Sequence, residues 1–139
     1  MGNLNDAWAQ DIGKILNDCG FSYKGMNCCE ELVFSKIREY AIPECVGCMV
    51  QIEYLVSCNN GVNDKDKVFV QFQSIMFVKK YESESTMYLN SNEKCIVLYN
   101  DIAIYNMKSK YDELNMTVWK MLQMSELKVK NVLGMQRIA

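Results

Sequence analysis

The sequence predicts an α+β fold: an antiparallel β-meander of about four to five strands, flanked by an N-terminal helix and C-terminal helices. Apolar residues recur at helical spacing at both ends of the chain, alternate with polar residues in the middle, and are separated there by short polar turns. Short turns between strands favour antiparallel pairing. The 139 residues fit a single domain spanning 1–139.

The first helix is predicted by one apolar stripe near the N-terminus. Its members recur at helical spacing: Trp8, Ile12, Ile15, Leu16 and Cys19. Asn3 or Asn5 can cap the start of this helix, and Gly20 stands where a left-handed residue commonly ends one.

Residues 21–45 leave two interpretations open. Phe21–Tyr23 can form a short strand. Residues 30–40 fit a helix with Val33, Ile37 and Tyr40 on one side, and they also fit a strand through Leu32–Phe34. We favour the helix, which Pro43 would end, because a proline disfavours helical geometry at the residue before it.

Two strands form the predicted centre of the sheet. In Met49–Ser57 the apolar residues Val50, Ile52, Tyr54 and Val56 alternate with polar ones. Asn59-Asn60-Gly61 then starts a polar turn, since Asn-Gly readily adopts positive φ. The strand Val68–Lys79 follows.

This second strand is apolar on both faces. One face carries Val68, Val70, Phe72, Met76 and Val78, and the opposite face carries Phe69, Ile75 and Phe77. A strand that is apolar on both faces is typically buried on both. We therefore expect a helix layer or a partner subunit to cover its second face.

The last third of the chain predicts short strands and then helices. The strands are Thr86–Leu89, Cys95–Tyr99 and, after a turn or bulge at Asn100-Asp101, Ile102–Tyr105. One helix is indicated by a buried stripe of Leu114, Val118, Met121 and Leu122. Ser125 can cap a second helix that passes through Leu127, Val132 and Met135.

The chain contains no histidine, which removes several classes of enzyme. Ser-His-Asp and Cys-His nucleophilic systems need an imidazole base, and zinc sites such as HExxH need histidine ligands. The sequence also has neither a P-loop nor a G-x-G-x-x-G run. We therefore expect a protein that is not an enzyme and that has no cofactor.

Seven cysteines occur without a preceding signal peptide. An odd count in such a chain favours free thiols in a reducing, intracellular compartment, so we expect a cytoplasmic protein. No apolar stretch approaches the ~18 residues of a membrane-spanning helix.

A small zinc-binding protein is the second hypothesis. Its ligands would be the C-x-x-C pair Cys45 and Cys48 together with Cys28 and Cys29. Adjacent cysteines make a poor first pair, and Cys45-x-x-Cys48 leads into a strand rather than into the helix that a redox motif needs. Packing of free thiols is therefore the preferred interpretation.

A carboxylate- or metal-dependent nuclease or hydrolase is the third hypothesis. The candidate clusters are Glu30-Glu31, Asp64 with Asp66, Glu82 with Glu84, and Asp112-Glu113. Neighbouring residues on a helix do not face one another, and charged loop residues are rarely buried. We favour a solvated surface for each cluster.

Charge argues against nucleic acid as the partner. The net charge is −2, the only adjacent basic pair is Lys79-Lys80, and no basic stripe is present. The chain has 13 Lys, 13 Asn, two Arg and one Pro, a bias typical of AT-rich genomes such as those of viruses, phages, low-GC bacteria and protozoa.

The leading hypothesis is therefore a non-catalytic protein–protein interaction domain that forms a homodimer. An adaptor, an inhibitor or immunity protein, a chaperone-like protein, and a viral or phage host-factor antagonist are subtypes of it. The predicted interface residues are Phe69, Ile75, Phe77 and Trp119. For Trp119, at the edge of its helical stripe, the core is the preferred position and the interface the alternative.

Overall fold

The computed structural model describes residues 6–41, 48–60, 67–83, 86–88, 96–106 and 111–133. Their elements in chain order are α1 (Ala7–Asp18), β1 (Ser22–Met26), β2 (Leu32–Ala41), β3 (Cys48–Asn60), β4 (Lys67–Ser83), β5 (Thr86–Tyr88), β6 (Ile96–Asn106) and α2 (Tyr111–Leu133). The predicted fold class is confirmed: along the chain, the strands of an antiparallel sheet follow an N-terminal helix and precede a C-terminal helix.

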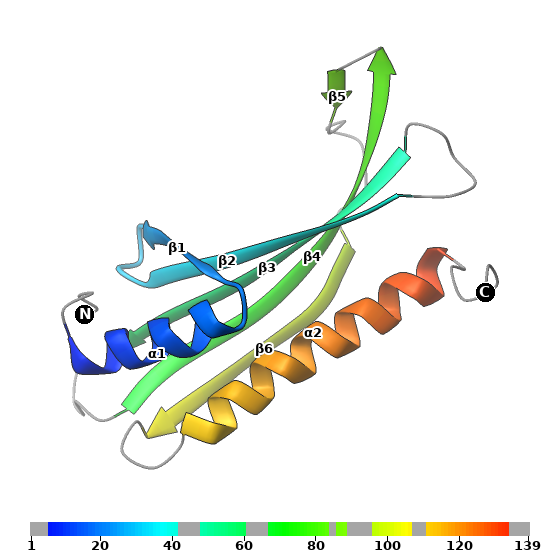
Figure 1. The fold of residues 1–139 in the computed structure, drawn as a ribbon. Coiled ribbons are helices and arrows are strands. Elements are labelled where there is room, and N and C mark those ends of the chain that lie inside the picture. Colours follow the sequence, from blue (N-terminus) through cyan, green and yellow to red (C-terminus); the bar gives the residue numbers. More distant parts are fainter. Residues whose placement is uncertain are drawn as a thin grey trace.

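The described strands form one antiparallel sheet. Strands β1 to β4 follow one another as a meander, and β3 and β4 pair over their whole common length, from Cys48 with Lys80 to Asn60 with Val68. The chain then departs from a simple meander, because β6 pairs with β4 and not with β5. β5 and the C-terminal end of β4 extend away from the helices (Figure 1).

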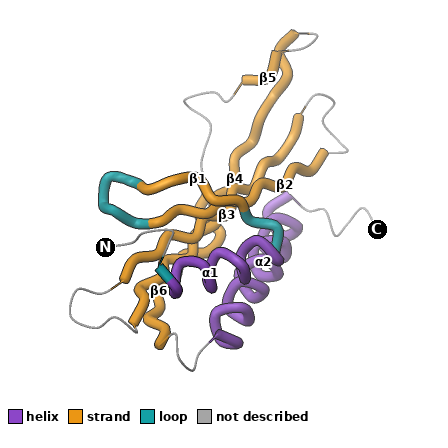
Figure 2. Tube along the Cα trace, turned by 60° about the vertical axis from the view of Figure 1, so that its left-hand side comes forward, coloured by secondary structure: helices purple, strands orange, loops and turns teal. Residues whose placement is uncertain are grey.

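Both helices lie on the same face of the sheet (Figures 1 and 2). The core between the two layers uses the alternate residues of each strand, among them Val50, Ile52, Tyr54 and Val56 of β3. In β4 the residues facing the helices are Val68, Val70, Phe72, Ser74 and Met76, all of them buried. The predicted phase of both strands is therefore confirmed up to Met76, and the side chain of Val78 lies outside the described residues.

Helix α1 follows the predicted stripe. Trp8, Ile12, Leu16 and Cys19 are buried, and Ile15 is half-buried against the core. The helix stops at Gly20, whose φ of 92° is the left-handed conformation that glycine adopts without steric cost. The Lys36 Nζ donates a hydrogen bond to the Cys19 carbonyl (2.9 Å), which ties the end of α1 to β2.

The favoured helix over residues 30–40 is wrong, because Leu32–Ala41 is strand β2. Alternation decides the outcome: Leu32 and Phe34 point into the core, whereas Ile37 is half exposed. Ten residues of β2 pair with β3, so the ladder of hydrogen bonds outweighs a helical spacing that local sequence alone cannot distinguish.

The two predicted C-terminal helices are one. Helix α2 runs without a break from Tyr111 to Leu133, and the stripe Leu114, Val118, Met121 and Leu122 is buried as expected. Ser125 caps nothing: it lies inside the helix, fully buried, and its hydroxyl shares a 2.6 Å hydrogen bond with Ser74 of β4. A buried partner on the sheet, invisible in the sequence, satisfies this hydroxyl.

The two strands predicted on either side of Asn100-Asp101 are also one, β6. The irregularity falls earlier: Ser74 pairs with Tyr99 and Ile75 with Val97, so Leu98 is an extra residue in the ladder. The sheet therefore has a bulge at Leu98, and pairing continues unbroken through Asn100-Asp101. Neither of the two described helices combines the length and the apolar run that crossing a membrane requires.

Candidate functional site

The sheet has one face with no helix on it in the described part of the chain (Figure 1). We call this face the open face. Phe69, Ile75 and Phe77 of β4 point toward it, since the alternate residues of β4 point to the helices. Phe69 is 41% exposed, and Ile75 and Phe77 are half-buried by their neighbours in the sheet.

Strand β6 enlarges the apolar part of the open face. Ile104 lies opposite Phe69, Ile102 opposite Gln71, and Val97 opposite Ile75. Directly opposed residues of an antiparallel pair share a face. The three β6 side chains are strongly exposed, at 54% for Val97, 68% for Ile102 and 56% for Ile104.

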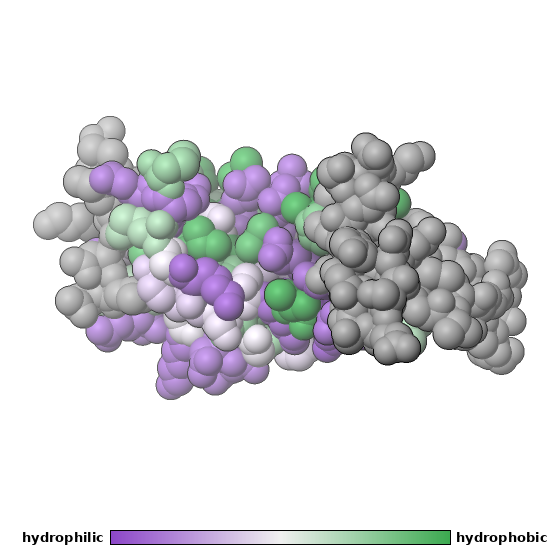
Figure 3. All heavy atoms as spheres, turned by 90° about the horizontal axis from the view of Figure 1, so that it is seen from above, coloured by the Kyte–Doolittle hydropathy of each residue, from purple (hydrophilic) through white to green (hydrophobic). Residues whose placement is uncertain are grey.

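The other half of the open face is mixed. Ser57, Glu53 and Gln51 of β3 lie opposite Gln71, Ile75 and Phe77 and share their face. Leu55 of β3 and the half-exposed Ile37 of β2 stand among them on this face. Most of the strongly exposed apolar residues nevertheless lie on the β6 side of the sheet. Figure 3 shows hydrophobic side chains set among hydrophilic ones on the side of the molecule seen from above Figure 1.

The expectation that a second layer covers this face is not met within the described chain. Phe69 is exposed because no described element packs on it. Sequence reasoning also missed Val97, Ile102 and Ile104. The bulge at Leu98 is the reason: in an unbroken strand Val97 and Ile102, five residues apart, would point to opposite faces, and the extra residue puts them on the same one.

Strand β6 also forms an open edge of the sheet. Among the described residues it pairs with β4 alone, so its far side carries no ladder. The opposite edge is blunted by the short strand β1, which has a bulge and a glycine at φ 108°, and by the charged Lys36, Arg38 and Glu39 of β2. Strand β6 has no lysine, arginine or proline, and its one charge is Asp101.

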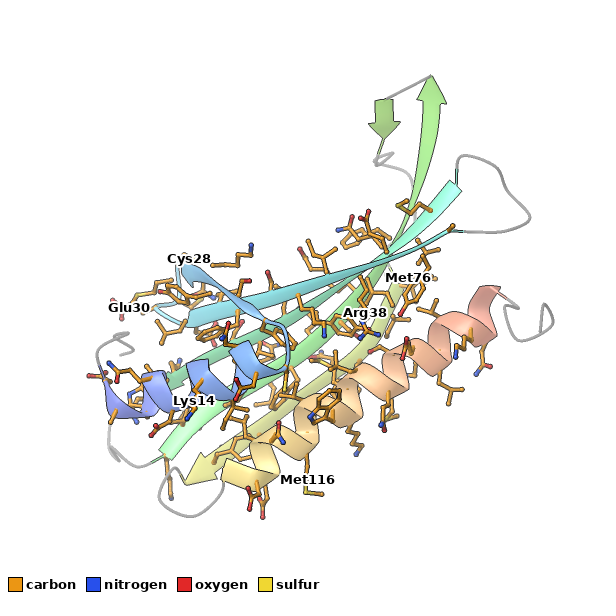
Figure 4. The ribbon with its side chains drawn as sticks, in the orientation of Figure 1. Lys14, Cys28, Glu30, Arg38, Met76 and Met116 are labelled. Carbon is orange, nitrogen blue, oxygen red and sulfur yellow. The ribbon has the colours of Figure 1, made fainter. Side chains whose placement is uncertain are left out.

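A groove of about 410 Å³ runs between this edge and α2. Its walls include Ala103, Ile104 and Tyr105 of β6, and Glu113, Met116 and Lys120 of α2. The Tyr105 hydroxyl donates a 2.9 Å hydrogen bond to Thr117 Oγ1 and fixes the two walls together. Met116 is 68% exposed and projects outward from α2 (Figure 4).

A second cleft, of about 480 Å³, lies between the two helices. Trp119 lines it together with Asp11, Lys14, Asp18, Asp112 and Asn115. Trp119 is 47% exposed, so its preferred assignment to the core is wrong. The structure brings Phe69, Ile75 and Phe77 onto one face and places Trp119 on the other side of the sheet, in this cleft.

The cysteines of the zinc hypothesis lie at the two ends of β2. Cys28 and Cys29 are exposed in the turn before β2 (Figure 4), whereas Cys48 starts β3 beside the end of β2. Ten residues of strand separate the two places by about 30 Å. Cys45 lies outside the described residues.

The thiols of Cys19, Cys29 and Cys58 have raised pKa values, which makes them poor nucleophiles. Burial raises the pKa of Cys19, and it raises the pKa of Cys58 to about 12. A hydrogen bond with the Cys28 side chain raises the pKa of Cys29. The raised pKa values keep these three thiols protonated at neutral pH. Their reactivity is therefore low, because the thiolate is the nucleophilic form.

The candidate carboxylates do not converge where they can be placed. Glu30 is exposed and Glu31 half-buried in the turn between β1 and β2, and Asp112 and Glu113 are exposed in the first turn of α2. Asp64, Asp66 and Glu84 lie outside the described residues, as does the side chain of Glu82. Among the described residues, no three His, Cys, Asp or Glu side chains are grouped to hold a metal ion.

The ionic contact between the sheet and α2 ties the two layers together. Arg38 Nη1 of β2 donates a 3.0 Å hydrogen bond to Glu126 Oε1, which also accepts one of 2.9 Å from the Tyr40 hydroxyl. Figure 4 shows Arg38 between β2 and α2. Both charged groups have a described partner, so this cluster has a structural explanation.

No protein-family model, curated protein or solved structure matches the chain. The features of this chain that can support a function are therefore the open face, the β6 edge and the two clefts.

Proposed function

We propose that this chain is a non-catalytic protein–protein interaction domain, and that it binds its partner through the apolar part of the open face. One observation carries the proposal: Phe69, Ile102 and Ile104 occupy neighbouring positions of β4 and β6 on the open face, and each is more than two-fifths exposed. Val97 is exposed on the same face, beyond the polar pair of Gln73 and Asn100. A contiguous exposed apolar surface on a folded domain is typical of an interaction site.

The free energy available on this face is large enough for specific binding. Complete burial of a Val, Ile or Phe side chain stabilises by about 1.5–3 kcal/mol. The four side chains are only partly buried in the isolated chain, so a partner that covers them gains several kcal/mol before the cost of association. Gln71 and Gln73 stand among them and supply hydrogen-bonding groups that orient a partner.

The proposal includes a homodimer and an intracellular, reducing setting. Free, protonated thiols at Cys19 and Cys58 are compatible with that setting. Within the class, an adaptor, an inhibitor or immunity protein, a chaperone-like protein and a viral or phage host-factor antagonist all bind through such a surface. We propose no cofactor and no nucleic-acid partner, since the chain has a net charge of −2 and no basic stripe.

The test is a comparison of two variants in affinity purification from the native cell, followed by mass spectrometry. The open-face variant carries Phe69→Ser with Ile75→Ser. The control carries Leu127→Ser, which removes an exposed apolar side chain from α2, in the helix layer on the other side of the sheet. Each partner recovered in this way is then purified, and its affinity for wild type and for each variant is measured by calorimetry.

We expect wild type and the Leu127→Ser control to bind a purified partner with similar affinity. The open-face variant should bind at least about tenfold more weakly, a loss of 1.4 kcal/mol. A partner that binds all three proteins equally well would show that the open face is not its binding site. An unchanged urea-unfolding midpoint must accompany the loss of binding, since both substitutions lie outside the core.

A further inference from the structure

The β6 edge and the groove beside it form a surface that is complementary to itself. The edge offers main-chain N–H and C=O groups on every second residue, because β6 pairs only with β4 in the described part of the chain. The usable stretch begins after the bulge, where the Lys128 Nζ already donates a 2.6 Å hydrogen bond to the Leu98 carbonyl. It extends from Asn100 to Asn106, seven residues that still belong to the sheet.

The side chains of β6 select one register for antiparallel pairing with themselves. A twofold axis at Ala103 places Ile102 of each copy opposite Ile104 of the other, on the open face, and gives two apolar cross-strand pairs. It also places Asp101 opposite Tyr105, whereas an axis at Asp101 would oppose two carboxylates. The smallest side chain of the strand, Ala103, lies at the axis, where the two copies approach most closely.

Helix α2 has a charge pattern that fits the same axis. Glu113 and Lys120 are exposed, stand seven residues apart and therefore lie on one side of the helix, and both line the groove beside Ala103. When two copies of α2 pair antiparallel about the turn at Met116 and Thr117, Glu113 of each approaches Lys120 of the other. A parallel arrangement would oppose like charges instead.

We propose that a second copy of this chain adds its β6 antiparallel to β6, so that the two sheets become one continuous sheet with paired α2 helices beneath it. The inference rests on the proposed function, since it names a second copy as one partner of the apolar surface at β6. The dimer buries Ile102 and Ile104 partly and leaves Phe69, Ile75 and Phe77 of both copies on one wide open face.

Helix α2 lies close enough to β6 to take part in this dimer. It contacts both β6 and β4, and the Tyr105 hydroxyl of β6 donates a 2.9 Å hydrogen bond to Thr117 of α2. Neighbouring strands lie about 4.8 Å apart and packed helices about 8–10 Å apart. Pairing of the two β6 strands therefore brings the Thr117 turns of the two α2 helices toward one another.

A charge-exchange experiment tests the pairing. Wild type should have about twice the 16.1 kDa mass of one chain by light scattering or sedimentation. Glu113→Lys alone, and Lys120→Glu alone, each create two like-charge contacts per dimer, so each should raise the dissociation constant of the dimer at least about tenfold. The double variant Glu113→Lys with Lys120→Glu restores both contacts and should dimerise within about threefold of wild type.

The two single variants should also pair with one another. In the mixed dimer, both contacts again join opposite charges, so a tagged Glu113→Lys chain should capture Lys120→Glu but not a second copy of itself. The matched control for Lys120→Glu is Lys130→Glu. It makes the same change of charge at an exposed position on a different side of α2, and it should leave the dimer intact. Amide exchange over residues 100–106 should slow as the protein concentration rises.

Three results would overturn this dimer: a wild type that stays monomeric at about 100 µM, single variants that dimerise like wild type, or a double variant no better than either single one. The open-face variant with Phe69→Ser and Ile75→Ser separates the two proposals, because both residues lie on β4, away from the axis. That variant should lose the outside partner and keep the dimer, and the charge variants should lose the dimer even if the outside partner proves absent.

Discussion

Tyr54 carries its hydroxyl into the core, where none of the described residues hydrogen-bonds to it. The side chain is fully buried, and its ring packs edge-on against Phe21 at 6.5 Å between centroids. Burial raises the pKa of Tyr54, so the hydroxyl stays neutral. An unpaired buried hydroxyl costs about 1–3 kcal/mol of stability. The packing of the Tyr54 ring, and not its hydroxyl, therefore stabilises the fold at this position.

Tyr54→Phe should therefore raise the free energy of unfolding by about 1 kcal/mol. Tyr105→Phe is the matched control: this buried tyrosine donates a 2.9 Å hydrogen bond to Thr117 Oγ1, so its loss should lower stability by about 1 kcal/mol. Urea unfolding of both variants measures the two effects. Opposite signs support this assignment, and a Tyr54→Phe protein that is the less stable of the two would contradict it.

Cys58 should make the fold sensitive to alkali. Burial raises its pKa from 9.0 to about 12, so below pH 9 both the folded and the unfolded chain hold the proton. Above pH 9 the unfolded chain releases that proton and the folded chain keeps it. Stability must then fall as pH rises toward 12, by up to about 1.4 kcal/mol per pH unit.

Cys58→Ala should flatten this loss. We expect the free energy of unfolding of wild type to fall more steeply with pH than that of the variant between pH 9 and about 11. The slopes are compared, and not the absolute values, because the substitution also removes buried volume. Parallel slopes would show that the Cys58 thiol titrates equally in both states.

At the scale of elements, a hydrogen bond between two serines links α2 to the middle of the sheet. Ser74 of β4 and Ser125 of α2 are fully buried, and their hydroxyls lie 2.6 Å apart. Each satisfies the other, so a single replacement leaves one buried hydroxyl without a partner.

Ser74→Ala and Ser125→Ala should each cost about 1–3 kcal/mol of stability. The double variant should cost clearly less than the two together, because it removes both polar groups at once. A double-mutant cycle from urea unfolding gives the coupling energy. Additive losses would mean that the two hydroxyls do not depend on one another.

Strand β2 and helix α2 are two places where the local sequence pattern does not determine the secondary structure. Residues 30–40 carry a helical spacing and an alternating one together, and only the ten-residue ladder with β3 separates the two. Serine is a favourable N-cap residue, yet α2 continues through Ser125, whose hydroxyl is hydrogen-bonded to that of Ser74. In both cases a long-range partner overrides the local preference.

At the scale of the whole molecule, the dimer should make thermal stability depend on concentration. A partner that binds only the folded chain stabilises it by mass action, so Tm should rise by a few degrees for each tenfold increase in protein concentration. The Lys120→Glu variant should show a much smaller rise, and Lys130→Glu the wild-type rise. A Tm of wild type that is independent of concentration would contradict the dimer.

The sequence by itself determined the fold class, the phase of β3 and β4, and the apolar stripes of α1 and α2, because these follow from periodicities of two and 3.6 residues within one segment. It also indicated that Phe69, Ile75 and Phe77 form an apolar face on which a second layer or a partner is expected to pack. Only the tertiary structure decided that β6 joins them, since the bulge at Leu98 changes which side chains of that strand face outward. It likewise put Trp119 on the opposite side of the molecule, because the packing of α2 on the sheet fixes which side of that helix faces the core.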